Sequence, residues 1–188
     1  MKPGGHLATA LALGGAGYVV TGSAELAGGC FAGGFLIDAD HYLDYLAFER
    51  QWRRPGPTEF LRYYFRHRYQ RIVLALHSLE LLVTLALLSV AWPRPALLGY
   101  LFGALLHVTL DILVNGEHLL KRPVLFYSFA YRASLGFATA RLQTPLVIPP
   151  EAGQAPIREF FTWRHLVRPV QPEHQGGQRQ PEQPPAHP

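Results

Sequence analysis

The sequence predicts an all-α protein: an integral membrane bundle of about four helices, with interfacial helices and a disordered C-terminal tail. Two observations lead to this prediction. Hydrophobic residues make up 49% of the 188 residues and charged residues only 16%, and the apolar residues are concentrated in long runs. We expect three regions: a membrane-embedded helical domain over residues 1–145, an interfacial segment over 146–168, and the tail over 169–188.

The first two helices are expected over residues 6–20 and 24–37. Both segments are rich in small residues and short for a membrane span, so tilted or partial insertion is one expectation. Gly29 and Gly33 are spaced four apart, as are Gly28 and Ala32. This spacing places small residues on one helix face and lets another helix backbone approach closely.

The next two helices are expected over residues 70–92 and 96–115. Each segment holds about twenty nearly continuous apolar positions, which is enough for one bilayer crossing. Only the tripeptide "PRP" separates them. Such a short break between two apolar runs predicts a helical hairpin.

The charge distribution predicts the orientation of this bundle. Residues 49–71, between the second and third segments, carry seven arginines against two glutamates. Cytoplasmic loops of membrane proteins carry such an excess of positive charge, so we expect this basic loop to face the cytoplasm. Its arginines alternate with aromatic residues, a mixture that favours anionic phospholipid head groups over nucleic acid beside apolar spans.

The remaining chain is predicted to lie outside the bundle. Residues 124–142 are apolar and aromatic but contain Arg132 and Arg141, so we expect them to lie on the membrane or to pack at its edge. The segment over residues 146–168 repeats the aromatic and basic pattern. The tail is composed of Pro, Gln, Gly and His, which cannot form a packed core.

Several ionisable residues lie inside or at the ends of the apolar segments, where such groups are costly and usually functional. His77 and Glu80 are three apart, and His107 and Asp111 are four apart, so each pair would share one helix face. With the predicted hairpin, every candidate gathers at the cytoplasmic end of the bundle. The candidates are His6, Asp38, Asp40, His41, His77, Glu80, His107 and Asp111.

Histidine and carboxylate side chains together suit zinc, manganese or iron, and this many groups could hold one or two ions. A hydrolytic metal site makes a nucleophile of water and polarises a phosphoryl or acyl oxygen. In such a site Asp38 or Glu80 could act as the general base. Arg66, Arg68 or Arg71 could hold the phosphate of an amphiphilic substrate.

The order of the motifs resembles a known family. His6, then "DADH" at 38–41, "HS" at 77–78 and "HVTLD" at 107–111 resemble the bacterial membrane-bound metal-dependent hydrolases, inner-membrane proteins distantly similar to zinc-dependent phospholipase C. The resemblance covers residues 1 to about 120. It implies a bacterial inner-membrane location and hydrolysis of a phosphoester. The ligands that it implies are His6, Asp38 or Asp40, His41, His77, His107 and Asp111.

Two other functions stay open at this point. The same residues could form a structural metal site or a proton or ion pathway in a non-catalytic membrane protein. A membrane-tethered nucleic-acid binder using residues 50–71 is a weaker alternative, which predicts binding that falls steeply with salt.

Overall fold

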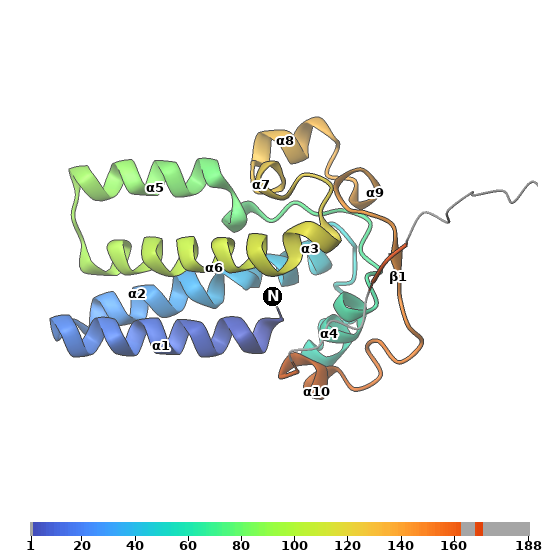
Figure 1. The fold of residues 1–188 in the computed structure, drawn as a ribbon, viewed down its shortest axis with the longest axis horizontal. Helices are drawn as coiled ribbons and strands as arrows, with labels where there is room; N and C mark the ends of the chain where they lie inside the picture. The colour runs from blue at the N-terminus through green and yellow to red at the C-terminus, as the bar shows by residue number, and fades with distance from the viewer. Residues whose placement is uncertain (1, 163–167, 171–188) are drawn as a thin grey trace, which may run out of the picture.

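The computed structural model describes residues 2–162 and 168–170, and it shows a mostly helical protein. Four long helices lie lengthwise together at one end of the molecule, and shorter helices gather at the other end (Figure 1). The described parts also contain a small antiparallel ladder of β1 (Leu146–Val147) and β2 (Arg168–Pro169). The all-α prediction is therefore confirmed in outline. Most of the predicted tail, and part of the predicted interfacial segment, lie outside the described residues.

The long helices begin and end at residues suited to these positions. α1 (Pro3–Thr21) starts with proline and ends at Gly22, which takes the left-handed conformation. α2 (Ala24–Gly34) and α5 (Leu79–Ala91) are capped by Ser23 and Ser78, whose side chains accept backbone hydrogen bonds from the first turn. α6 (Pro95–Leu119) again begins with proline. The predicted hairpin is thus formed by α5 and α6.

Helices α2 and α6 pack through glycines on both sides. A Cβ atom at Gly29 or Gly33 of α2 would overlap carbonyl oxygens of α6. In the same way, a Cβ at Gly99 or Gly103 of α6 would overlap carbonyl oxygens of α2. Gly28 has open space around it. Of the two small-residue pairs singled out in the sequence, the structure therefore uses Gly29 and Gly33 for close backbone approach.

The prediction of a single helix over residues 70–92 is wrong for its first half. Residues 70–72 run beside 137–139, with the Ile72 amide donating to the Phe137 carbonyl. Leu74 then takes a left-handed conformation, with φ 44°, and a short 3₁₀ turn, η2 (Ala75–His77), leads into α5. His77 consequently precedes the helix that contains Glu80, and the two do not share a helix face.

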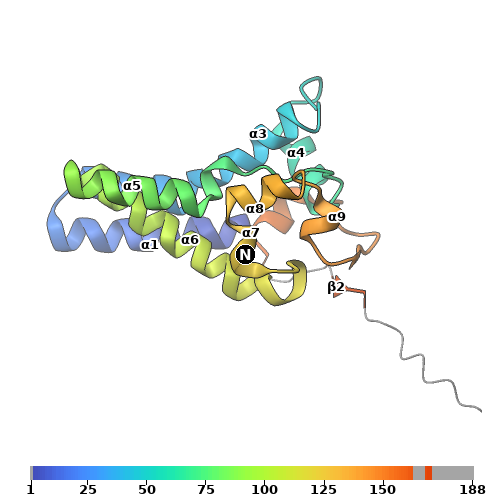
Figure 2. The ribbon, with the colours of Figure 1, turned by 90° about the horizontal axis from the view of Figure 1, so that it is seen from above.

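The shorter elements form a cap at one end of the four long helices. Figure 2 shows the molecule, including this cap, from above. Its elements are η1 (Leu36–Asp38), α3 (Ala39–Ala47), α4 (Pro57–Phe65), η2, α7 (Pro123–Phe126), α8 (Phe129–Ser134), α9 (Thr139–Leu142) and α10 (Pro156–Phe160). α10 lies beside the start of α1, where the Lys2 ammonium donates to the Thr162 hydroxyl at 3.1 Å. The apolar segment over 124–142 contains three short helices, α7, α8 and α9.

Within the described residues, one helix is long and apolar enough to cross a membrane. It is α6, over Pro95–Val114, with a mean hydropathy of 1.9. α5 is apolar but shorter. An integral membrane bundle of four spanning helices is therefore not established by helix length and composition.

Candidate metal centre

Four elements bring histidine and aspartate side chains together where the long helices meet the cap. His6 comes from the second turn of α1, Asp38 from η1, His77 from η2, and His107 and Asp111 from the second half of α6. The three histidines are each only 1% exposed. Residues separated by up to 105 positions in the chain thus meet in one buried cluster.

The centre of the cluster is formed by Asp38, His77 and His107. The Nε2 atoms of the two histidines lie 3.0 Å apart, and Asp38 Oδ1 lies 3.5 Å from the first and 3.4 Å from the second. Two ligand atoms in a tetrahedral zinc site, each about 2.1 Å from the ion, are about 3.4 Å apart. The three atoms therefore have the mutual spacing of ligands around one ion.

The hydrogen bonds of the other ring nitrogens strengthen this interpretation. His107 Nδ1 lies 2.9 Å from the Gly34 carbonyl oxygen, which can only accept, so Nδ1 donates. His77 Nδ1 lies 3.0 Å from both oxygens of Asp40 and donates to that carboxylate. In the neutral rings, both Nε2 lone pairs then face each other. This arrangement is repulsive unless a cation or a proton lies between them.

A second group of ligands adjoins the first. His6 Nε2 lies 3.0 Å from Asp111 Oδ1, and His107 Nε2 lies 3.6 Å from Asp111 Oδ2. The rings of His6 and His107 stack with their centroids 3.6 Å apart, and the buried Nδ1 of His6 has no hydrogen-bond partner. Because His107 contacts both Asp38 and Asp111, the two groups are continuous and offer ligands for one or two ions.

His41 stands beside the first group. Its Nε2 lies 3.7 Å from Asp38 Oδ1, and its ring contacts the rings of His77 and Tyr64 edge-on. His41, Asp38 and His77 offer ligand atoms that all lie within 4.8 Å of one another. His41 can therefore complete the coordination of an ion held by Asp38 and His77.

Burial and mutual charge shift the pKa values of the groups on the cap side. Burial alone would lower the pKa of His77, but the Asp40 and Asp38 carboxylates outweigh it and raise that pKa to about 9. Burial would raise the pKa of Asp38, yet the neighbouring histidines hold it well below the usual range. For His41, burial outweighs the adjacent carboxylates and lowers its pKa. Without a metal ion, Asp38 is thus ionised, His41 neutral and His77 protonated near pH 7, so an ion bound here would displace the proton of His77.

The irregular segment that carries His77 is held in place by side chains from the cap. Asp44 accepts the backbone amides of Val73 and Leu74 at 2.7 and 3.0 Å. Asp40 accepts those of Leu76 and His77 at 3.0 and 3.3 Å. The segment therefore does not need helical hydrogen bonds for these donors, and it can take the left-handed turn that aims His77 at His107.

The carbonyl groups of the same segment are satisfied by Arg132 of α8. This arginine is fully buried, and its guanidinium donates to the carbonyl oxygens of Val73 (3.1 Å) and Leu74 (2.8 Å) and to that of Phe126. From the sequence, the segment that contains Arg132 was expected to lie on the membrane or to pack at its edge. The structure instead makes Arg132 the buried support of the His77 segment.

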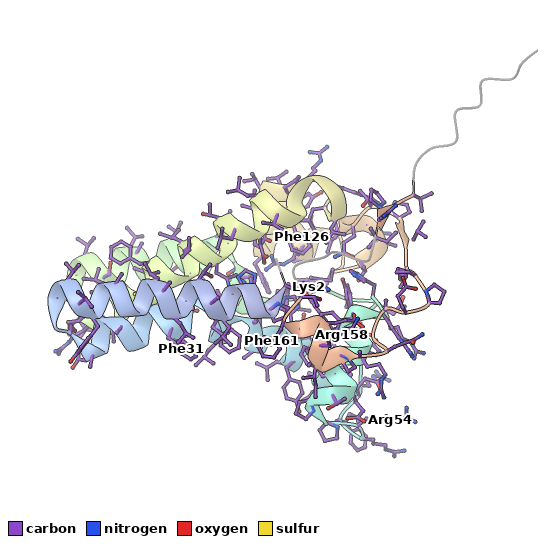
Figure 3. All side chains as sticks on the ribbon, turned by 60° about the horizontal axis from the view of Figure 1, so that its bottom comes forward. Lys2, Phe31, Arg54, Phe126, Arg158 and Phe161 are labelled. Atoms are coloured by element: carbon purple, nitrogen blue, oxygen red, sulfur yellow. The ribbon has the colours of Figure 1, made fainter. Side chains whose placement is uncertain are left out.

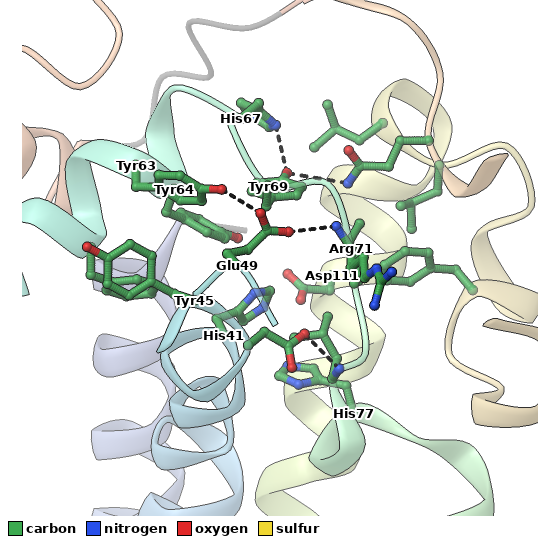
Figure 4. A pocket seen from close by; sticks show the side chains of 18 of the residues that line it. His41, Tyr45, Glu49, Tyr63, Tyr64, His67, Tyr69, Arg71, His77 and Asp111 are labelled. Carbon is green, nitrogen blue, oxygen red and sulfur yellow. Dashed lines mark hydrogen bonds between the residues drawn. The ribbon is translucent and has the colours of Figure 1, made fainter. Parts of the chain in front are cut away.

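A pocket opens from the cluster toward the cap. Its empty space, counted together with the open solvent at its mouth, is about 770 Å³. Figure 4 shows His41, His77 and Asp111 on one side of the pocket and the rings of Tyr63, Tyr64 and Tyr69 around it. Leu119, Leu120 and Phe126 add apolar side chains to its wall. Part of the metal-ligand cluster is therefore accessible from outside the protein.

The remaining candidates, Glu80 and the three arginines, differ in where they lie relative to the cluster and its pocket. Glu80 lies away from the cluster, because its carboxylate accepts hydrogen bonds from the Ser128 hydroxyl and from the Phe129 and Ala130 amides at the start of α8. Arg66 donates to the Ala152 carbonyl. Of the three candidate phosphate-binding arginines, Arg71 lines the pocket.

Two residues near the cluster were not among the predicted site residues. Tyr127 is 3% exposed, lines the pocket and forms a hydrogen bond with Asp111. Asp44 supports the His77 segment from one helical turn beyond Asp40. The spacing of Asp40 and Asp44, four residues apart on a short amphipathic helix, is the pattern that could have indicated a shared structural role.

Comparisons with known proteins give no relative. The chain matches no family model, no curated protein and no solved structure. The resemblance to membrane-bound metal-dependent hydrolases stays a prediction.

Proposed function

We propose that this protein is a membrane-embedded, metal-dependent hydrolase that acts on a phosphoester of a lipid or a related amphiphile. The proposed metal is zinc, with manganese or iron as alternatives, and one or two ions are bound. The observation that supports it best is the meeting of two histidine Nε2 atoms, 3.0 Å apart, beside the Asp38 carboxylate, next to an open pocket.

In this proposal His77, His107 and Asp38 form the first ligand group, with His41 alongside. His6 and Asp111 extend the group from the bundle side. Asp40 orients the His77 ring and keeps its Nε2 free for the metal. When bound, a divalent ion would lower the pKa of a water molecule and polarise a phosphoryl oxygen.

The general base and the phosphate ligand follow from the same contacts. The Glu80 carboxylate accepts a hydrogen bond from the Phe129 amide at the start of α8. Of the two residues considered for the general base, Asp38 is therefore the one that we propose. Arg71 on the pocket wall is the candidate to hold the phosphate. The apolar side chains of Leu119, Leu120 and Phe126 offer a surface for the hydrocarbon part of the substrate.

The outer surface of the bundle supports a membrane location. Large apolar side chains are exposed along three of its helices, far more than isolated surface residues would explain. They include Leu11, Val19 and Val20 of α1, Val83, Leu87 and Val90 of α5, and Phe102, Leu105 and Leu113 of α6. Because the arginines of residues 50–71 lie on the cap, the rule of positive cytoplasmic loops orients the cap and the metal centre toward the cytoplasm of a bacterial inner membrane.

The pocket also bears on the non-catalytic alternative. A structural metal site has a closed ligand shell, whereas a catalytic site keeps one position open to solvent or substrate. Here His41, His77 and Asp111 line a pocket with an open mouth. This favours catalysis over a purely structural ion.

Elemental analysis tests the metal centre. The detergent-purified protein is compared with His77→Ala and His107→Ala, and with His67→Ala as a control on the pocket wall outside the two ligand groups. We expect stoichiometric metal in the wild-type and control proteins and its loss in the other two. A wild-type protein that binds no offered zinc, manganese or iron would contradict the proposal.

Activity is tested separately with phosphomonoester and phosphodiester lipids. We expect the metal-loaded wild-type protein to release phosphate or a phosphorylated head group, and Asp38→Asn to release neither. Metal binding without hydrolysis of any phosphoester would support the structural-site alternative instead.

A further inference from the structure

The loop between α3 and α4 projects from the cap and carries unusual side chains at its end. This tip loop, residues 48–56, contains Trp52, which is 61% exposed, and Phe48, which is 47% exposed. Leu43, on the helix that leads to the loop, is 57% exposed. Figure 2 shows α3 and its following loop leaving the body of the molecule obliquely. More than half of the large Trp52 indole is therefore uncovered by the protein.

The tip loop is also basic. Arg50, Arg53 and Arg54 are all exposed, and Figure 3 shows Arg54 at the outer edge of the molecule, away from the long helices. The carboxylate of Glu49 is bound elsewhere, because it accepts from the Tyr63 hydroxyl and from the Gln70 and Arg71 amides. The exposed acid closest in sequence is Glu59, in the first turn of α4.

The loop is anchored rather than loose. The hydroxyl of Tyr45 donates to the Arg54 carbonyl at 2.6 Å, and that of Tyr42 donates to the Pro55 carbonyl. The Arg54 amide donates to the Gln51 carbonyl at 2.8 Å. The indole of Trp52 is therefore presented at the surface by a fixed backbone, with the Arg53 guanidinium 4.9 Å above its ring.

The opposite end of the bundle carries a matching pair. Trp92, which is 62% exposed, follows α5, and the Arg94 guanidinium lies 5.0 Å above its ring. α6 runs from this turn to the metal centre, and Asp111 lies 16 residues after Pro95, which is about 24 Å along the helix. Tryptophan and arginine together are typical of the two interfaces of a membrane, where amphipathic rings lie at the level of the head groups.

We propose that the tip loop binds the head-group layer of an anionic bilayer, with Trp52 inserted and Arg50, Arg53 and Arg54 on lipid phosphates. This inference rests on the proposed membrane placement of the bundle. It adds a consequence for the pocket, because Tyr45, Phe60 and Tyr63 of α3 and α4 line its wall. Contact of the tip loop with lipid holds that wall at the membrane surface, where a lipid phosphoester would enter.

Tryptophan fluorescence of the full-length protein in lipid nanodiscs tests the proposal. The sequence has three tryptophans, so Trp92→Phe with Trp163→Phe leaves Trp52 alone, and Trp52→Phe with Trp163→Phe leaves Trp92 alone. Discs contain phosphatidylcholine with or without phosphatidylglycerol. We expect Trp52 to emit at shorter wavelength, to be quenched by head-group-proximal brominated lipid, and to be protected from acrylamide when phosphatidylglycerol is present.

Two further variants test whether the arginines of the tip loop, rather than arginine charge elsewhere, hold Trp52 in the lipid. In the Trp52-only protein, Arg53→Gln with Arg54→Gln should reverse the blue shift and restore quenching by acrylamide. Arg94→Gln, at the other end of the bundle, is the matched control and should leave Trp52 unchanged. The metal content of every variant is measured in parallel, so loss of the metal centre is recognised independently of lipid contact.

The two tryptophans distinguish a failure of the tip-loop proposal from a failure of the proposed membrane placement. If Trp92 is quenched by brominated lipid while Trp52 stays fully accessible to acrylamide in both kinds of disc, the tip-loop proposal is overturned and the bundle placement stands. If neither tryptophan is quenched by brominated lipid, the membrane placement is overturned, and the tip-loop proposal falls with it.

Discussion

Replacing Asp40 with asparagine should weaken metal binding without removing a metal ligand. The carboxylate contacts His77 Nδ1 through both oxygens at 3.0 Å, and it accepts the Leu76 and His77 amides. Asparagine keeps one oxygen for the backbone amides but loses the negative charge and replaces the other oxygen with a donor. The ring proton of His77 is then less firmly held on Nδ1, so Nε2 is less available as a ligand.

The expected loss is 10- to 100-fold in metal affinity, the usual effect of removing such an orienting carboxylate. At 1.36 kcal/mol per tenfold change, this corresponds to about 1.4–2.7 kcal/mol. The assay is competition between the purified protein and a chelator of known zinc affinity. A thermal melt of the metal-free protein shows whether the fold is kept.

Asp44→Asn is the matched control for this prediction. Asp44 also accepts two backbone amides of the His77 segment, at Val73 and Leu74, but no described hydrogen bond joins it to a histidine ring. We expect a lower melting temperature with a smaller loss of zinc affinity. Equal losses of affinity in the two variants, or wild-type affinity in a folded Asp40→Asn protein, would refute the assigned role of Asp40.

Three other substitutions test other parts of the structure. Asp38→Asn should lower zinc affinity in the chelator assay more than Asp40→Asn does, because it changes a proposed ligand; an equal or smaller effect would exclude direct ligation. Arg132→Met should destabilise the fold by about 3 kcal/mol or more in denaturant unfolding, because buried carbonyls lose charged donors, and an unchanged midpoint would contradict this. Gly33→Val should lower the melting temperature markedly, whereas Gly28→Val, in open space, should change it little; similar effects would argue against the α2–α6 contact.

The ligands of the candidate centre could be anticipated from the sequence because histidine and aspartate are costly in apolar segments. His107 and Asp111 illustrate this: their four-residue spacing within a long apolar run predicted both the helix and the shared face, and the structure brings them within 3.6 Å. The first half of residues 70–92 could not be predicted in this way. Its hydropathy fits a helix, but its backbone is satisfied by Asp40, Asp44 and Arg132, which lie about 30 to 60 residues away.

The position of Glu80 could not be predicted from local spacing either. Its position three residues after His77 suggested a shared face only if both residues belonged to one helix. The helix begins at Leu79, and the Glu80 carboxylate is captured by the start of α8, nearly 50 residues further along the chain. Local spacing predicts a common face only where the local conformation is already known.

The glycine contact between α2 and α6 determines more than how tightly two helices pack. Gly33 lies against α6, and the next residue, Gly34, accepts the Nδ1 proton of His107 through its carbonyl oxygen. Sliding α6 by one residue along α2 would move His107 by about 1.5 Å and rotate it by about 100° around the helix axis. The register of the contact between α2 and α6 thus fixes the position of the His107 ring and its hydrogen bond to Gly34. A change in how these two helices pack should therefore change the metal affinity.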